Sequence, residues 1–259
     1  MFIMYNKEKE KISTLPGAGP FFFKGNETGI LMLHGGGGGT CADLKPLAEE
    51  LHNKMGYTLS IPLLPGYGTT PELLKDVKIQ DWKSAIQTQI DTLKTQCKKL
   101  FIGGHSMGGI LTFIMAAEHN PMGIFTISTP YELKGFILKL LPFINIFKTY
   151  HRIDAEQLKN ESNGQWVGYN KIPINIGIKI KRLLDEMKTC LPKVKCPAIL
   201  FQGKHDSVIK EDSMSLIFDK INSTQKRKVW LEHSDHPILG MPDHDLILSE
   251  LIKFINNVS

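Results

Sequence analysis

Ser106 stands at the centre of residues 104–108, which read GHSMG and fit the G-x-S-x-G pattern of a nucleophilic serine. The apolar residues 100–102 before it predict a buried strand, and the apolar residues 110–117 after it predict a buried helix. At such a junction the chain turns so sharply that only glycine fits on either side of the serine. The turn also points a helix N-terminus at the hydroxyl, where its positive partial charge favours a developing anion. The sequence therefore predicts a serine nucleophile.

A neutral serine hydroxyl needs an imidazole to take its proton and a carboxylate to orient that imidazole. In a parallel sheet these partners are expected in loops that follow strands, at the same edge as the serine. Asp206 follows an apolar run at 198–202, and His236 lies in the loop after 229–231. The chain order of serine, aspartate and histidine is the one expected for this kind of serine turn. We predict Ser106, Asp206 and His236 as the catalytic residues.

Other side chains in the same loops are alternatives for these two roles. Asp212 and Asp235 are the other candidate acids, but Asp212 is expected to cap the helix at 211–221 and Asp235 is adjacent to the base. His233 is the other candidate base. His236 is preferred because it lies deeper in the loop, closer to where a turn at the sheet edge approaches the serine.

The oxyanion that forms during acyl transfer needs two backbone N–H donors. Met107, directly after the nucleophile, is expected to supply one, and the glycine-rich loop at 34–39 the other. Gly36 is the predicted donor in that loop, with Gly37 as the alternative. The glycine run lacks the Gly-Lys-Ser/Thr of a P-loop and does not fit G-x-G-x-x-G after the strand, so a nucleotide site is not predicted.

Apolar runs of strand length alternate with amphipathic segments along most of the chain. Expected strands are at 20–24, 29–33, 57–62, 100–102, 123–128, 196–203 and 228–231, and expected helices at 42–54, 81–97, 110–117, 211–221 and 243–256. This alternation predicts an α/β domain with a mostly parallel sheet and helices on both faces. The alternation stops at Pro130, and no buried strand is expected from 131 to 188. We therefore predict a core of 1–130 and 189–259 with an insertion, or cap, at 131–188.

The bulk composition excludes several other classes of protein. The 259 residues are 42% hydrophobic and 22% charged, which is ordinary for a globular domain. The net charge of +5, without Lys/Arg-rich blocks, argues against a nucleic-acid partner. No apolar run approaches the roughly 20 residues of a membrane helix, and the N-terminus becomes charged too early for a secretory signal, so a cytoplasmic protein is expected. The four scattered cysteines predict reduced thiols and no structural metal.

Five short motifs together resemble those of the α/β-hydrolase superfamily, in particular small bacterial carboxylesterases and monoacylglycerol lipases. They are LHGG at 33–36, PGYG at 65–68, GHSMGG at 104–109, GKHD at 203–206 and SDH at 234–236. The resemblance implies the α/β-hydrolase fold with a small cap inserted after the sixth strand. It also implies Ser106 as nucleophile, Asp206 as acid, His236 as base, and Gly36 with Met107 as oxyanion donors, with no metal or cofactor.

The sequence departs from this family pattern at two positions. Gly36 stands where the relatives usually carry a bulkier residue, often aromatic, which suggests a more open wall on the acyl side. Asp235 replaces the usual glycine before the histidine and brings an extra carboxylate close to the base.

The insertion is expected to decide the substrate. Phe136, Ile137 and Leu140 are predicted to bind substrate in an acyl tunnel, although plain packing of the cap would explain them equally well. Trp166 and Tyr169 are further candidates for the pocket.

The resulting hypothesis is a serine hydrolase of carboxylic esters, with short- to medium-chain acyl esters, including monoacylglycerols, as the small-molecule substrates. One alternative is a thioesterase or acyltransferase with the same triad, in which Lys179, Lys181 and Arg182 would bind the phosphates of an acyl-CoA. The other alternative is a non-catalytic ligand-binding member of the fold. That reading is disfavoured because such proteins usually lose a triad residue.

Overall fold

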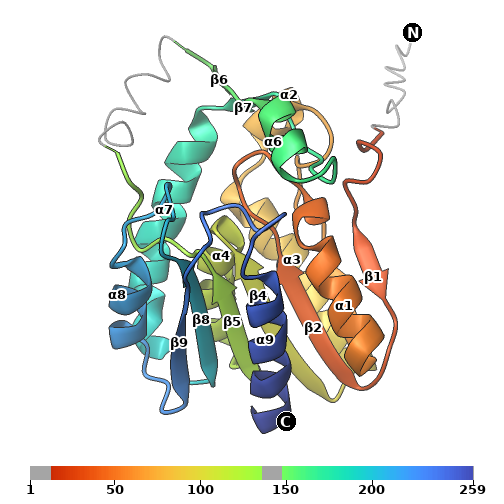
Figure 1. Cartoon of the computed structure of the whole chain (residues 1–259), viewed down its shortest axis with the longest axis vertical. Helices are drawn as coiled ribbons and strands as arrows, with labels where there is room; N and C mark the ends of the chain where they lie inside the picture. The colour runs from red at the N-terminus through yellow and green to blue at the C-terminus, as the bar shows by residue number, and fades with distance from the viewer. Residues whose placement is uncertain (1–12, 136–147, 259) are drawn as a thin grey trace, which may run out of the picture.

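The computed structural model describes residues 13–135 and 148–258, and a seven-stranded sheet forms the centre of this part (Figure 1). The strand order is β1-β3-β2-β4-β5-β8-β9. All neighbours run parallel except β1 and β3. The strands are β1 (Phe21–Phe23), β2 (Thr28–Leu33), β3 (Thr58–Ile61), β4 (Lys99–His105), β5 (Gly123–Ile127), β8 (Ala198–Gly203) and β9 (Lys226–Leu231).

Helices cover both faces of the sheet, and each face has its own hydrophobic core. Leu31 and Leu33 of β2 point to one face and Ile30 and Met32 to the other, because successive side chains of a strand alternate. The first face is covered by α3 (Ile79–Gln96), α4 (Met107–His119), α7 (Asn175–Cys190) and α8 (Ser213–Lys220). The second is covered by α1 (Lys45–Met55) and α9 (His244–Val258), which lie in front of the sheet in Figure 1. The expected mostly parallel sheet with helices on both faces is confirmed.

The pattern of each helix explains how deeply it is buried. α3 buries Trp82, Ile86, Ile90 and Leu93, a stripe spaced three or four residues apart. α4 is apolar on all sides and is buried from Met107 to Ala116, so it lies in the middle of its layer. Each fully buried leucine or isoleucine contributes about 1.5–3 kcal/mol to folding. Within the described residues no helix is long and apolar enough to cross a membrane.

One predicted helix is interrupted near its start. The helix expected at 42–54 is divided into a 3-10 turn, η1 (Cys41–Asp43), and α1, which begins at Lys45. The hydroxyl of Thr40 accepts from the N–H of Ala42 and caps η1. Pro46 lies in the first turn of α1, where a backbone N–H would have no partner within the helix, so proline is tolerated there. The prediction of one continuous helix was therefore wrong, and η1 keeps Asp43 next to the glycine loop.

The segment after β5 adds no strand to the large sheet in its described part, as expected. It contains β6 (Tyr150–Arg152), α6 (Ala155–Glu161) and β7 (Lys171–Pro173), and β6 pairs with β7 in a separate sheet. α6, β6 and β7 lie at the top of Figure 1, beyond the ends of the central strands. The C-terminal half of α7 instead buries Leu183 and Met187 in the same core as α4.

The expected position of the insertion, after the sixth strand, was wrong for the described residues. Five strands of the large sheet, β1 to β5, precede it, and the sixth, β8, follows it. The count of six came from the family resemblance alone, whereas the apolar runs before residue 131 predict five strands, the number observed.

Candidate active site

Ser106 lies between the end of β4 and the start of α4, in the sharp turn that its sequence predicts. Its backbone angles, φ 54° and ψ −117°, are ones that residues with side chains rarely adopt. Close packing makes the flanking glycines necessary, because a side chain at Gly104 would collide with the backbone of Gly108 and one at Gly108 with the carbonyl of Leu33. The Ser106 N–H donates to the carbonyl of Ile127 over 2.9 Å, which ties the turn to β5.

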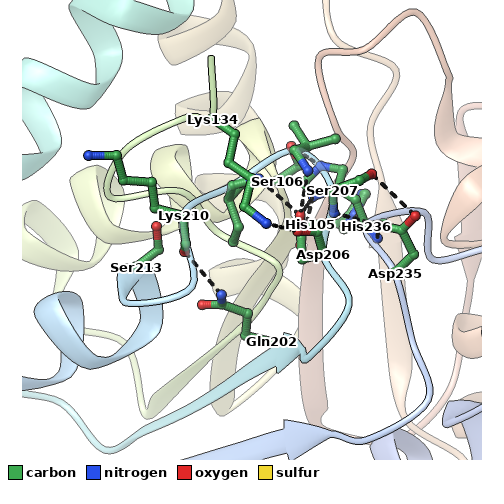
Figure 2. A network of polar contacts seen from close by, with 12 residues as sticks. His105, Ser106, Lys134, Gln202, Asp206, Ser207, Lys210, Ser213, Asp235 and His236 are labelled. Carbon is green, nitrogen blue, oxygen red and sulfur yellow. Dashed lines mark hydrogen bonds and ion pairs between the residues drawn. The ribbon is translucent and has the colours of Figure 1, made fainter. Parts of the chain in front are cut away.

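The structure brings Ser106, His236 and Asp206 into one chain of hydrogen bonds (Figure 2). His236 Nε2 lies 3.0 Å from Ser106 Oγ, and His236 Nδ1 lies 2.9 Å and 3.1 Å from the two carboxylate oxygens of Asp206. An ionised carboxylate only accepts hydrogen bonds, so Nδ1 carries the proton and Nε2 is free to accept from the serine hydroxyl. This is the arrangement in which an imidazole deprotonates a serine.

Asp206 is held ionised although it is only 2% exposed. Burial on its own raises the pKa of this carboxyl, but hydrogen bonds from His236 and from the N–H groups of Val208 and Ile209 outweigh burial and lower the pKa below its ordinary value. Both amides donate to Oδ1 over 2.9 Å, so the loop after β8 itself fixes the carboxylate. A fixed negative charge therefore lies 2.9 Å from His236 Nδ1.

The alternative acids and base lie in other environments. Asp235 accepts from the N–H of Ser207 over 2.7 Å and from its hydroxyl over 3.2 Å, so it links the two loops that carry Asp206 and His236. Asp212 is exposed at the start of α8, and its side chain makes no capping hydrogen bond, contrary to expectation. The N–H of His233 donates to Asp243, and His233 is exposed.

Residues 132–134 lie against the loop that carries Asp206. Leu133 forms an antiparallel bridge with Ile209, and Glu132 forms an ion pair with Lys210. The ammonium of Lys134 donates to the carbonyl of Asp206 over 2.6 Å, as Figure 2 shows. The start of the segment at 131–188 is therefore joined directly to the acid, a contact that no pattern in the sequence indicated.

His105 supports the backbone of His236 and is not itself placed as a base. Its Nε2 donates to the carbonyl of His236 over 2.8 Å, and its Nδ1 is buried without a hydrogen-bond partner. Burial, with the neighbouring His236 as the second cause, lowers the pKa of His105 to about 3. A neutral ring is thus packed beside His236, with the two ring centroids 5.1 Å apart.

Gly36 and Met107 both line the cavity beside Ser106, at the two positions predicted for oxyanion donors. Neither N–H donates a hydrogen bond to another described residue. Tyr67, which is 1% exposed, donates its hydroxyl to the carbonyl of Gly36 over 3.3 Å and contacts Met107 Sδ at 3.8 Å. Tyr67 therefore positions both residues. The PGYG motif pointed to this loop, but nothing in it specified the contact.

His34 holds the first turn of the glycine loop in place. The ring is fully buried, with Nδ1 donating to the carbonyl of Gly35 over 2.8 Å and Nε2 accepting from the N–H of Leu64 over 3.1 Å. These two bonds need the neutral ring, because an imidazolium has no acceptor. Burial, only partly offset by the bond to Gly35, lowers the pKa of His34 to about 4.

Acid is therefore expected to destabilise the protein through His34. The unfolded chain binds a proton near pH 6.5 and the folded chain near pH 4, so the stabilisation is present above pH 6.5 and is lost as the pH falls toward 4. Between pH 7 and pH 5 this group alone is expected to lower the free energy of unfolding by about 2 kcal/mol. Urea unfolding at the two pH values, for wild type and His34→Gln, measures it. An equal pH dependence in both proteins would contradict the assignment.

A cavity of about 400 Å³ opens onto Ser106 and His236. Its walls come from the glycine loop, from the loops after β5, β8 and β9, and from the segment at 131–188. The apolar residues that line it are Met107, Pro130, Leu133, Leu158, Trp166, Ile180, Val208, Pro237, Ile238 and Leu239. Most of these residues come from separate loops, so no sequence pattern connected them. A mostly apolar cavity beside a serine suits an acyl group.

Of the residues expected to form the substrate pocket, Trp166 lines the cavity and Tyr169 does not. Phe136, Ile137 and Leu140 lie outside the described residues. Tyr169 donates to the carbonyl of Gly66 over 2.6 Å and holds the loop of Tyr67 instead.

The space beside Gly36 is not left open, contrary to expectation. A side-chain carbon added at Gly36 would lie 3.1 Å from Ile180 Cδ1 and 2.8 Å from Met107 Sδ. Ile180 comes from α7 and fills room that a larger residue at 36 would otherwise occupy.

The basic residues considered for acyl-CoA phosphates are mostly engaged elsewhere. Lys179 donates to the carbonyl of Lys75 over 2.9 Å, and Lys181 pairs with Asp185 at 3.2 Å. Arg182 is exposed. Among the described residues, no group of three or more His, Cys, Asp or Glu side chains is arranged to hold a metal ion.

Comparison with known proteins matches the chain to a family model and to two relatives over nearly their full length. Residues 25–243 match the family described as serine aminopeptidase, S33. The chain is 31% identical over 247 residues to a thermostable monoacylglycerol lipase of Bacillus sp. (strain H-257), covering 95% of this chain and 97% of the relative. It is 26% identical over 243 residues to a carboxylesterase of Bacillus subtilis (strain 168), covering 92% and 96%.

Two solved structures superpose on nearly the whole of this chain. One from work on the metagenome-derived lipolytic enzymes LipS and LipT superposes with a TM-score of 0.86 at 30% identity, covering 95% of this chain and 100% of that one. A monoacylglycerol lipase of Paleococcus ferrophilus superposes with a TM-score of 0.77 at 16% identity, covering 93% and 99%, which is a likeness of fold.

Proposed function

Because this chain belongs to the serine aminopeptidase S33 family of α/β hydrolases, we propose that it hydrolyses carboxylic esters with Ser106 as the nucleophile. The observation that carries the proposal is the unbroken chain of hydrogen bonds from Ser106 through His236 to Asp206, at the mouth of an apolar cavity. The relatives matched over nearly the whole chain are named as a monoacylglycerol lipase and a carboxylesterase, which favours esters over peptides and thioesters.

Acylation begins when Ser106 Oγ attacks the ester carbonyl carbon and His236 Nε2 takes its proton. The charge on the resulting imidazolium is stabilised by Asp206, whose depressed pKa keeps it ionised. The carbonyl oxygen becomes negative and accepts from the N–H groups of Gly36 and Met107, each contributing about 3 kcal/mol of transition-state stabilisation. His236 then returns the proton to the alcohol oxygen, the C–O bond breaks, and the acyl group remains on Ser106.

Deacylation repeats the same steps with water in place of the serine. His236 Nε2 takes a proton from a water molecule, whose oxygen attacks the acyl-enzyme carbonyl. The same two N–H groups hold the second oxyanion, and protonated His236 returns the hydrogen to Ser106 Oγ as the acid leaves.

The proposed substrates are short- to medium-chain acyl esters, including monoacylglycerols. The cavity volume of about 400 Å³ supports an acyl chain of modest length. The mostly apolar walls of the cavity suit such a chain. Residues 131–188 act as a cap in this proposal, which is supported by Leu158, Trp166 and Ile180 lining the cavity.

A serine-directed fluorophosphonate probe and a set of nitrophenyl esters test the proposal. Wild-type protein is expected to bind one probe molecule covalently per chain and to hydrolyse nitrophenyl butyrate, with butyryl-CoA a much poorer substrate. Folded protein that neither reacts with the probe nor cleaves any ester would contradict the proposal and favour a ligand-binding role. A clear preference for the thioester would move the chain to the thioesterase alternative.

A further inference from the structure

Asp43 contributes a carboxyl to the wall of the cavity, whereas Asp206 does not line it. Asp43 ends η1, directly after the glycine loop, and lines the same cavity as Ser106 and His236. Gly39 leaves room for it, because a side chain at Gly39 would collide with the carboxyl of Asp43. The absence of a side chain at Gly39 thus allows an acidic group to lie against the oxyanion loop.

The carboxyl of Asp43 has no hydrogen-bond partner among the described residues. Its Oδ1 is buried and unpaired, and no described lysine, arginine or histidine forms an ion pair with it. The nearby Lys45 pairs instead with Glu49 at 3.2 Å. Burial raises the pKa of Asp43 to about 7, so near neutral pH the group is present in both protonation states. Oδ1 itself is enclosed, but the side chain as a whole is only half-buried, so its other oxygen, Oδ2, is the atom that a ligand in the cavity can reach. A carboxyl without a partner beside an apolar cavity is unfavourable to folding, and a ligand that supplies the partner explains why such a group is kept.

We infer that the Asp43 carboxyl binds a hydroxyl group of the leaving alcohol, so that monoesters of polyols are preferred over esters of simple alcohols. This inference rests on the proposed function and specifies its substrate class. It assigns Asp43 a role in selecting the substrate and none in the bond-breaking steps.

The chemistry of the cavity favours a hydroxyl at this position. The remaining walls are mostly glycine and apolar side chains, which suit an acyl chain that has no hydrogen-bonding group beyond its carbonyl. The polar part of the substrate is then its alcohol. A hydroxyl both donates to a carboxylate and accepts from a carboxylic acid, so it pairs with Asp43 in either protonation state. An anionic alcohol would be repelled by the ionised form, and a cationic one would lose its partner when the acid is protonated.

Three esters of the same acid separate these cases: glycerol monobutyrate, ethyl butyrate and butyrylcholine. The measured quantity is the ratio of kcat/KM for glycerol monobutyrate to that for ethyl butyrate. Replacement Asp43→Leu is expected to lower this ratio by about 10-fold to 100-fold, the effect of losing a hydrogen bond to a group that is partly charged. Replacement Asp43→Asn keeps the shape and a hydrogen-bonding amide, and is expected to lower the ratio less. Glu49→Gln, an acidic residue of α1 outside the cavity, is the matched control and is expected to leave the ratio unchanged.

The inference is overturned if Asp43→Leu and Asp43→Asn both keep the wild-type ratio, or if wild type prefers butyrylcholine to glycerol monobutyrate. Thermal unfolding of each variant shows whether it is folded. If the Asp43→Leu protein does not fold, the kcat/KM ratio of the isosteric Asp43→Asn protein decides the test. Failure of the proposed function has a different signature: wild type would cleave none of the three esters and would not react with the fluorophosphonate probe.

Discussion

Replacing Ser106 with alanine is expected to lower kcat for nitrophenyl butyrate by about 10⁶-fold, the loss typical of a triad that acts as a unit. Without the hydroxyl, His236 has no nucleophile to activate, and no acyl-enzyme can form. The substitution removes one oxygen atom at a position where the backbone is held by Gly104, Gly108 and the bond to Ile127, so the fold is expected to remain.

Steady-state kinetics and probe labelling measure this effect. Ser249→Ala is the matched control, because Ser249 is half-buried on α9, does not line the cavity, and donates its hydroxyl to the carbonyl of Leu246 over 3.0 Å. Labelling is expected to disappear in the first variant and to be complete in the second. A Ser106→Ala protein that keeps a rate close to wild type would mean that another group is the nucleophile.

Replacing Asp206 with asparagine is expected to lower kcat by about 10⁴-fold. The amide oxygen can still accept from Val208 and Ile209, so the loop should keep its shape. The amide nitrogen, however, donates toward His236 Nδ1 and favours the tautomer whose proton is on Nε2. That ring can no longer accept the proton of Ser106 and loses the charge that stabilises an imidazolium.

Asp212→Asn provides the comparison for this prediction. Asp212 belongs to the same region of the chain, was an alternative acid in the sequence, and is exposed at the start of α8. Its replacement is expected to change kcat less than two-fold, a surface effect. Equal losses in the two variants, or a larger loss at Asp212, would contradict the role given to Asp206.

The structural features that could be predicted from the sequence are those formed by residues adjacent in the chain. The strand and helix on either side of Ser106 are both continuous apolar runs, and the glycines between them leave a sharp turn as the only fit. Asp206 and His236 each directly follow a buried strand, and parallel strands bring such loops to one edge of the sheet. Local pattern and sheet topology were therefore enough to bring the three residues together.

Contacts between distant segments could not be predicted in this way. The hydrogen bonds from Tyr67 to Gly36 and from Lys134 to Asp206 join residues far apart in the chain. The sequence contains other tyrosines and lysines, and nothing in it distinguishes these two from the rest. The unpaired state of Asp43 depends on what surrounds it, which composition and spacing do not contain. The extra helical turn at η1 arose from the local capping by Thr40 and was hidden within one amphipathic pattern.

The backbone angles of Ser106 have a consequence for protein engineering. At φ 54° and ψ −117° a residue with a side chain is strained by about 1–3 kcal/mol, whereas glycine tolerates such angles. A library of variants selected only for heat resistance would therefore be drawn toward glycine at 106 and would discard the nucleophile while improving the scaffold. Selection for a sturdier enzyme has to be coupled to ester turnover in every round.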